Sequence, residues 1–212
     1  SVVDRIMGLS GNDAIRSGDG NDVLDGGVGD DQLIGGGGTD ALIGGAGNDV
    51  LIGDDEGLAV GGGLPDPGDL PPVPGDGLID PVSGPLDPVG SPHVFFSGND
   101  VLDGGDGDDG LMGKAGNDTL IGGAGNDIYI LGLGDGMDRL HDTSGLGQEN
   151  GIAWVPGITA SDLTFTQDQN TLIIVYSAWG DAVVLEDFDP SNVNGSLVVS
   201  TLLFADGSSV SM

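Results

Sequence analysis

A large apolar residue recurs every nine positions along most of the chain, each time two residues after an aspartate. The apolar positions of the first run are Ile6, Ile15, Leu24, Leu33, Leu42 and Leu51. After an interruption, the same phase returns at Leu102, Leu111, Leu120 and Tyr129. Ten aspartates in one phase do not arise from composition alone, so the chain is built from nonapeptide repeats.

The repeats follow the pattern G-G-x-G-x-D-x-U-x, with U the large apolar residue, as in residues 44–52, with departures in the first copy and at Leu9-Ser10, Ser17 and Lys114. The three residues x-U-x predict a short strand with U facing inward. The six residues G-G-x-G-x-D predict a chain reversal, because glycine readily adopts the positive φ angles that it needs. Two nonapeptides then close one coil of a flattened solenoid, in which neighbouring coils stack ~4.8 Å apart and alternate turns lie on opposite edges.

Stacking of the coils places the aspartates above one another. We expect one edge to carry Asp13, Asp31, Asp49, Asp109 and Asp127. The other edge should carry Asp4, Asp22, Asp40, Asp100, Asp118 and, from a final copy slipped by two residues, Asp138.

Stacked carboxylates among backbone carbonyls form an all-oxygen environment. Ca²⁺ accepts such ligands in irregular geometry, whereas Mg²⁺ demands a tighter octahedron and Zn²⁺ prefers His or Cys. Turn capping without metal is the alternative, but carboxylates at this spacing would repel one another. Four gaps between stacked aspartates on one edge and five on the other predict about seven to nine calcium ions.

These motifs resemble the RTX (repeats-in-toxin) family of haemolysin-type calcium-binding nonapeptide repeat proteins, over residues 4–54 and 97–140. The resemblance implies an all-β fold, a calcium-binding parallel β-roll followed by a small antiparallel β cap. It implies that each ion lies between two turns on one edge, held by aspartates and turn carbonyls. The aspartates implied as ligands are Asp13, Asp22, Asp31, Asp40, Asp49, Asp100, Asp109, Asp118, Asp127 and Asp138. The implied glycine ligands are Gly27, Gly29, Gly36, Gly38, Gly45, Gly47, Gly105, Gly107, Gly116, Gly123 and Gly125.

Charge and composition limit the classes of partner and of function that we expect for this chain. The 212 residues include 44 Gly, 35 acidic and 4 basic residues, for a net charge of −31. Such a charge argues against nucleic acid and anionic membranes as partners. Cysteine is absent, so no disulfide scaffold is expected, and no run approaches the ~18 apolar residues of a membrane span. Neither H-E-x-x-H nor G-x-S-x-G occurs, so we expect no enzyme in this fragment, and any catalytic domain to lie outside it.

Residues 55–96 form a Pro-rich insertion that interrupts one turn of the roll. Gly53 and Asp54 together with residues 97–103 complete a single nonapeptide, so the register should continue across it. The insertion is interpreted either as a tolerated surface loop or as a recognition loop.

Residues 141–212 lose the repeat and follow the roll, residues 1–140, as a β-rich cap. Strand-like runs are expected at 151–155, 163–166, 171–176, 181–185 and 197–204, with hairpins around 168–170 and 178–181. Its aromatic residues should pack the cap or, alternatively, form a ligand-binding patch; they are Trp154, Phe165, Trp179, Phe188 and Phe204.

Two functions follow from the resemblance. The first is a calcium-dependent folding, stability and secretion module of a type I secreted RTX protein, such as a toxin, adhesin or secreted enzyme. Its partners would be calcium and the type I secretion machinery, and it would be secreted or lie at the bacterial cell surface. The alternative is an extracellular ligand-binding or polysaccharide-binding module that uses the insertion and the cap. The chain begins at Ser1 without a visible signal peptide, and we expect it to be a fragment of a larger protein.

Overall fold

The computed structural model describes residues 2–54, 98–142, 149–178, 180–186, 188 and 199–212. The described residues form strands in two sheets and contain no helix that could cross a membrane. Sheet A has, in spatial order, β1 Arg5–Met7, β3 Val23–Val28, β5 Ala41–Ala46, β7 Val101–Asp106, β9 Thr119–Ala124, β11 Met137–His141, β15 Ala182–Leu185, β14 Thr171–Val175 and β13 Thr164–Asp168. Sheet B has β2 Ala14–Asp19, β4 Gln32–Gly37, β6 Val50–Ile52, β8 Gly110–Met112, β10 Ile128–Leu131, β12 Gly151–Trp154, β16 Thr201–Leu203 and β17 Ser209–Ser211.

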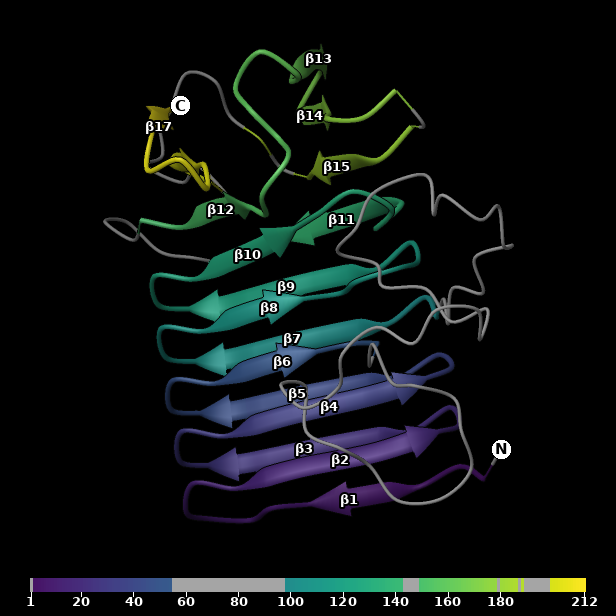
Figure 1. The fold of residues 1–212 in the computed structure, drawn as a ribbon. Helices are drawn as coiled ribbons and strands as arrows, with labels where there is room; N and C mark the ends of the chain where they lie inside the picture. Colours follow the sequence, from purple (N-terminus) through teal and green to yellow (C-terminus); the bar gives the residue numbers. More distant parts are fainter. Residues whose placement is uncertain (1, 55–97, 143–148, 179, 187, 189–198) are drawn as a thin grey trace.

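From β1 to β11 the chain alternates between the two sheets, and every neighbouring pair within a sheet is parallel (Figure 1). Within the uninterrupted repeats, partners are 18 residues apart, as in the pair Leu24 and Leu42. The apolar U positions face inward and form the core, because leucines such as Leu33 and Leu120 are 0% exposed. The expected all-β parallel β-roll is therefore confirmed.

Six strands of the roll are longer than the three residues expected from the repeat: β2, β3, β4, β5, β7 and β9 have six residues each, whereas β1, β6 and β8 have three. Pairing continues from the x-U-x segment through the first three turn positions, so β3 pairs with β5 as far as Val28 and Ala46. The reason lies in the backbone of the turn. Its first glycine, Gly26 in β3, is absent from the residues with positive φ, and the chain reverses only at Gly27 and Gly29.

The register passes unchanged across the insertion. Residues 55–97 lie outside the described residues, but Leu42 pairs with Leu102 and Leu51 with Leu111 as in adjacent coils. The expected continuity of the roll is confirmed.

The cap continues both sheets before it turns antiparallel. β15 adds to β11, and β12 and β16 add to β10, all in parallel. The antiparallel partners β14, β13 and β17 follow at the outer ends, through hairpins that include the two expected ones. The cap is thus a mixed extension of the roll with an antiparallel outer layer.

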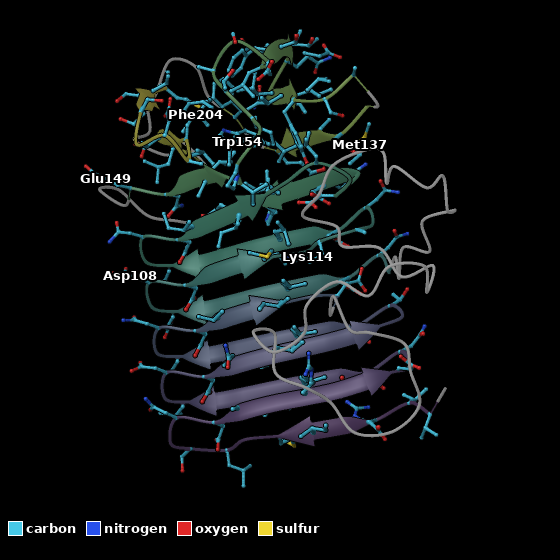
Figure 2. All side chains as sticks on the ribbon, viewed as in Figure 1. Asp108, Lys114, Met137, Glu149, Trp154 and Phe204 are labelled. Carbon is cyan, nitrogen blue, oxygen red and sulfur yellow. The ribbon has the colours of Figure 1, made fainter. Side chains whose placement is uncertain are left out.

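Three of the five aromatic residues pack the cap. Trp154, Phe188 and Phe204 are buried, and Figure 2 shows Trp154 and Phe204 within the cap. Phe165 is 49% exposed, because all of β13 lies at the sheet edge. The prediction that Phe165 packs the cap was therefore wrong. Trp179 lies outside the described residues.

Candidate metal centre

The aspartates of the repeats form two hydrogen-bonded ladders, one on each edge of the roll. The amide of each aspartate donates to Oδ1 of the aspartate one coil further along the chain, at 2.6–3.0 Å. The first edge carries Asp13, Asp31, Asp49, Asp109 and Asp127. The second edge carries Asp4, Asp22, Asp40, Asp100, Asp118 and Asp138. The expected stacking, including the slip of two residues at Asp138, is confirmed.

The other carboxylate oxygen of each rung except Asp4 is buried without a hydrogen-bond partner among the described residues. Side chains such as Asp49, Asp100 and Asp118 are at most 1% exposed. Buried polar atoms are normally satisfied, so these oxygens indicate a missing partner. The orphaned atoms are Oδ2 of Asp13, Asp22, Asp31, Asp40, Asp49, Asp100, Asp109, Asp118, Asp127 and Asp138.

The first glycine of each turn keeps a small space open beside this oxygen. A Cβ added at Gly44 would lie 2.5 Å from Oδ2 of Asp49 and 2.5 Å from the carbonyl oxygen of Gly104 in the next coil. A carboxylate and a neighbouring carbonyl therefore border a space from which side chains are excluded. Both are hard oxygen donors, so the residues fit Ca²⁺.

Side chains alone do not complete a site. No three His, Cys, Asp or Glu side chains within the described ranges are arranged to hold a metal ion. Each pair of turns offers two aspartates, and backbone carbonyls would supply the remaining ligands.

Burial raises the pKa of many ladder carboxyl groups above the ordinary value of 3.8. Loss of hydration is the main cause, and the charges of stacked neighbours add to it. The pKa is raised to about 7 for Asp100 and Asp109, and to about 9 for Asp138. It is raised to about 6 for Asp118 and Asp127. Keeping these carboxylates ionised without a metal therefore costs free energy, and a bound cation would offset that cost.

The glycines implied as ligands lie in the turns as expected. Ten of them have φ between +100° and +151°: Gly27, Gly29, Gly36, Gly38, Gly45, Gly47, Gly105, Gly107, Gly123 and Gly125. Gly116 lacks a positive φ, and Lys114, at the second position of the same turn, has φ 75°. Whether these carbonyls bind calcium stays a prediction.

The glycines implied as ligands do not include the first glycines, although a Cβ added at such a glycine would meet both an orphaned oxygen and the first-glycine carbonyl of the next coil. The carbonyls concerned are those of Gly26, Gly44, Gly53, Gly104, Gly113 and Gly122. Their recurrence at the same nine-residue spacing was the available signal.

A second, outer ladder also went unnoticed. The amide of Asp108 donates to Oδ1 of Asn48 at 2.9 Å, and the amide of Asn126 donates to Oδ1 of Asp108 at 2.8 Å. The amide of Glu149 continues the series by donating to Asn126 at 2.9 Å, and Figure 2 shows Asp108 and Glu149 on the same edge. The signal was the Asn or Asp at the fifth position of most repeats.

The first edge ends in hydrogen bonds between protein groups. Asn150 replaces the next aspartate and accepts from the amide of Asp127 at 2.8 Å. The Tyr129 hydroxyl lies beside Gly122, where other turns have the carbonyl of the next coil. It accepts from the Gly122 amide at 3.0 Å and donates to Asp142 at 2.8 Å.

Besides Lys114, two further residues replace turn glycines on the second edge. Ser17 occupies a first-glycine position, and its hydroxyl donates to the carbonyl of Gly35 at 2.7 Å. Asp54 occupies a second-glycine position and is 3% exposed. Its Oδ2 accepts from the Gly98 amide at 3.2 Å, across the insertion, while Oδ1 has no partner among the described residues. Asp54 thus adds a carboxylate that the repeat pattern does not predict.

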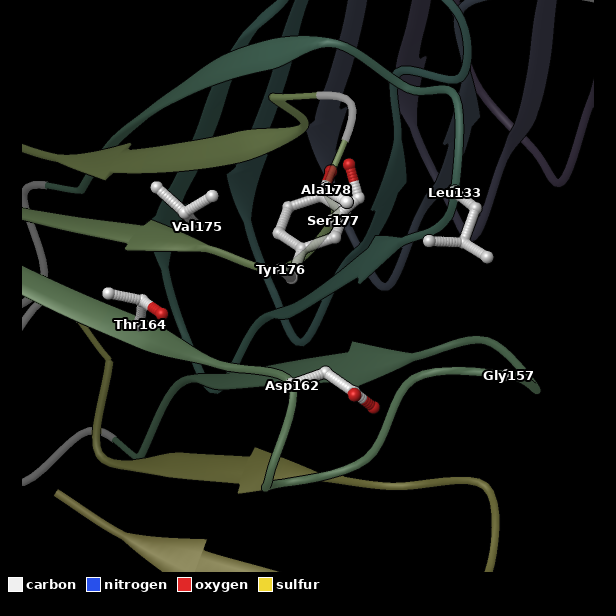
Figure 3. Close-up of a pocket in the computed structure, with 8 residues that line it drawn as sticks. All are labelled: Leu133, Gly157, Asp162, Thr164, Val175, Tyr176, Ser177 and Ala178. Atoms are coloured by element: carbon white, nitrogen blue, oxygen red, sulfur yellow. The ribbon is translucent and has the colours of Figure 1, made fainter. Parts of the chain in front are cut away.

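A shallow open groove of about 450 Å³ lies on the cap (Figure 3). Its described lining contains one carboxylate, Asp162, which accepts hydrogen bonds from Thr159. The remaining lining residues are Leu133, Gly157, Thr164, Val175, Tyr176, Ser177 and Ala178.

Comparison with known proteins gives one informative match. No curated protein is significantly similar to this sequence. The crystal structure of the extracellular lipase LipA from Serratia marcescens aligns at 17% identity and a TM-score of 0.33, covering 86% of this chain and 37% of the lipase. A TM-score of this size does not establish a common fold. The model of the RTX calcium-binding nonapeptide repeat matches four times, at residues 3–33, 34–55, 97–120 and 111–138. Residues 3–55 and 97–138 are therefore nonapeptide repeats of the RTX calcium-binding type.

Proposed function

We propose that this chain is the calcium-dependent folding and secretion module of a type I secreted RTX protein, and that any catalytic domain lies outside it. The observation that carries the proposal is the pair of columns of buried Oδ2 atoms without partners. Each column runs along one edge of the roll. Six of the oxygens border a space edged by a glycine carbonyl of the next coil, namely those of Asp13, Asp31, Asp40, Asp49, Asp100 and Asp109.

Calcium would link the environment to folding. The chain carries a net charge of −31, and its ladders stack carboxylates one above another. Without a cation, repulsion between these charges therefore destabilises the roll. An ion that binds the roll but not the unfolded chain contributes its binding free energy to folding. An expanded chain at low calcium suits passage through a narrow export channel, and the higher calcium outside the cell would then fold it.

The residues that would hold the ions are the ladder aspartates together with turn carbonyls. Four gaps on the first edge and five on the second give about seven to nine ions, as the sequence predicts.

The test is a calcium titration of the whole chain, followed by far-UV circular dichroism, hydrodynamic radius and a count of bound metal. We expect a cooperative gain of β-structure, a smaller radius and seven to nine ions per chain. A roll that is equally folded in chelator, or that binds fewer than five ions, would contradict the proposal.

Ligand binding by the cap and the insertion is the second candidate. The cap groove favours it, because a solenoid end that only closed the roll would not need a concave surface. The test is whether immobilised polysaccharides retain the whole chain. Loss of retention after deletion of residues 55–96, with calcium-induced folding intact, would favour this second role.

A further inference from the structure

The outer face of sheet B carries no acidic residue in its two columns of outward residues. On each strand the residues before and after the inward apolar residue face outward, because side chains alternate along a strand. The outward residues of neighbouring strands lie side by side from β2 to β16. The first column consists of Ala14, Gln32, Val50, Gly110, Ile128, Gly151 and Thr201, and the second consists of Arg16, Ile34, Ile52, Met112, Ile130, Ala153 and Leu203.

The second column is apolar over most of its length. Ile34, Ile52 and Met112 follow one another along the sheet and are partly exposed. Val50 in the first column is 44% exposed, and Leu203 at the far end of the second column is 36% exposed. Contiguous apolar surfaces of this kind mark contact sites on proteins.

The outer face of sheet A differs in its charge. There, Asp25 and Asp103 flank Ile43 in the corresponding column, and Arg139 and His141 lie on β11. The edges of the roll carry the aspartate ladders. In a chain with a net charge of −31, two copies therefore meet through sheet B without bringing carboxylates together.

The size of this face matches a small specific interface. Strands of six residues, such as β4, stacked ~4.8 Å apart from β2 to β16, give a flat area of about 600 Å². Two copies packed face to face would bury about 1,200 Å², the lower end of the range for specific complexes.

A two-fold axis along the strands matches the order of the residues in the second column. β8 lies in the middle of the stack from β2 to β16, so an axis at β8 places β6 opposite β10 of the second copy and β4 opposite its β12. Ile52 would then contact Ile130 of the second copy, and Ile34 would contact Ala153 of the second copy. The column thus faces itself in reverse order, as an isologous contact requires.

The same arrangement brings opposite charges together at both ends. Arg16 on β2 would lie opposite Leu203 on β16 of the second copy, beside the turn between β16 and β17 that carries Asp206. Asp206 is exposed, and it accepts hydrogen bonds from the hydroxyl and the amide of Ser208 at 2.6 Å and 2.8 Å. These bonds hold the pKa of Asp206 below its ordinary value of 3.8, so the carboxylate is charged at neutral pH.

We propose that a second copy of this chain docks on the outer face of sheet B, through a two-fold contact that is centred on β8 and flanked at each end by Arg16 and Asp206. The apolar residues of the second column form the interior of the contact, and burial of their surface drives association. The two caps then lie at opposite ends of the pair. This surface is one that the proposed function does not use.

The test is sedimentation velocity on the whole chain in calcium, with circular dichroism to check that each variant is folded. We expect the unmodified chain to form dimers with a dissociation constant in the micromolar range. Ile52→Lys should weaken the dimer more than about a hundredfold, because it buries an unpaired charge in the contact. Ile43→Lys, at the same repeat position on sheet A, is the matched control and should dimerise like the unmodified chain.

A charge exchange tests the arrangement of the two copies. Arg16→Glu should weaken the dimer about tenfold, and the double variant with Asp206→Lys should recover the affinity, because opposite charges again face each other. Arg16 and Asp206 lie at opposite ends of sheet B within one copy, so a purely structural effect at Arg16 would not be reversed by the change at Asp206.

A folded chain that stays monomeric would overturn the inference. Dimers that Ile43→Lys disrupts and Ile52→Lys does not would place the contact on sheet A and overturn it as well. A chain that dimerises only after deletion of residues 55–96 would show that this segment, and not a second copy, occupies the face. If Ile52→Lys does not fold, the charge exchange decides alone. Calcium-dependent folding is reported separately by circular dichroism, so it stands or fails independently of the dimer.

Discussion

The first glycine of each turn is the residue on which the calcium edges depend most. At Gly44 a methyl group would enter the space between the Asp49 carboxylate and the Gly104 carbonyl, each 2.5 Å away. Gly44 does not have a positive φ, so the requirement comes from contact and not from backbone conformation.

Gly44→Ala should therefore weaken calcium-induced folding, with a loss of ~1–3 kcal/mol typical of overpacking. The measurement is the midpoint of folding against calcium, which should shift to higher concentration. Gly110→Ala is the matched control, because its nearest atom, the carbonyl oxygen of Asp49, would lie 3.9 Å away. Equal midpoints for the two variants would show that the space is not needed.

A second residue-scale prediction concerns Tyr129, which closes the first edge. Tyr129→Phe leaves the buried Gly122 amide without its acceptor and Asp142 without one donor. The loss should be about 1–3 kcal/mol, because unmet hydrogen bonds of buried groups are costly. Urea unfolding in saturating calcium measures it. The number of bound ions should not change, and a loss of one ion would show that Tyr129 binds metal instead.

At the scale of elements, the insertion separates two strands that behave as neighbours. β5 pairs with β7 through five partner pairs across it, from Ala41 and Val101 to Ala46 and Asp106. Deleting residues 55–96, so that Asp54 joins residue 97, should preserve calcium-induced folding, because the turn is completed by the remaining residues. The cost of closing a loop rises only slowly with length, so stability should be unchanged or slightly higher. Circular dichroism against calcium tests this, and a variant that no longer folds would contradict it.

The sequence predicted the repeating elements better than their ends. The nine-residue phase placed Leu24, Leu42 and Leu102 in one core column, because a regular solenoid repeats the same local environment. Asn150 continues the ladder although it lies 23 residues after Asp127, and a repeat period cannot predict such a spacing. Asp181 reaches the last turn from a distant hairpin, so its position follows from cap packing and not from any local motif.

For the whole molecule, calcium and protons should compete for the same carboxylates, so the effect of pH on folding should depend on calcium. The raised pKa values, about 7 for Asp100 and Asp109 against 3.8 unfolded, mean that the metal-free roll binds protons more tightly than the unfolded chain. Without calcium, this contribution to stability is fully present below pH 3.8 and is lost as the pH rises through about 7. Calcium-free circular dichroism should therefore show more β-structure at acid than at alkaline pH.

With calcium present, the trend should reverse, because protons compete with the ion for the same oxygens. Acidification should release bound metal, which dialysis against buffers of falling pH would measure. Metal binding that is independent of pH would show that the aspartates are not the ligands.

A further whole-molecule prediction separates specific binding from charge screening. Magnesium at the same concentration should fail to fold the chain, because it prefers a tight octahedral shell and keeps its waters. The comparison is a pair of circular dichroism titrations in calcium and in magnesium. Equal folding in both would show that divalent charge is sufficient.

The ladders also give the roll a direction. In the inner ladder each coil offers an amide toward the cap and accepts with a carboxylate on its opposite face, as between Asp31 and Asp49. The outer ladder runs the other way, since Asp108 donates back to Asn48. The two faces of a coil are therefore complementary to each other and not to themselves. Two such rolls could add end to end only head to tail, a geometry that produces open filaments. The cap covers one of these two faces, so no second roll can add there. The cap therefore stops the roll from growing into a fibre.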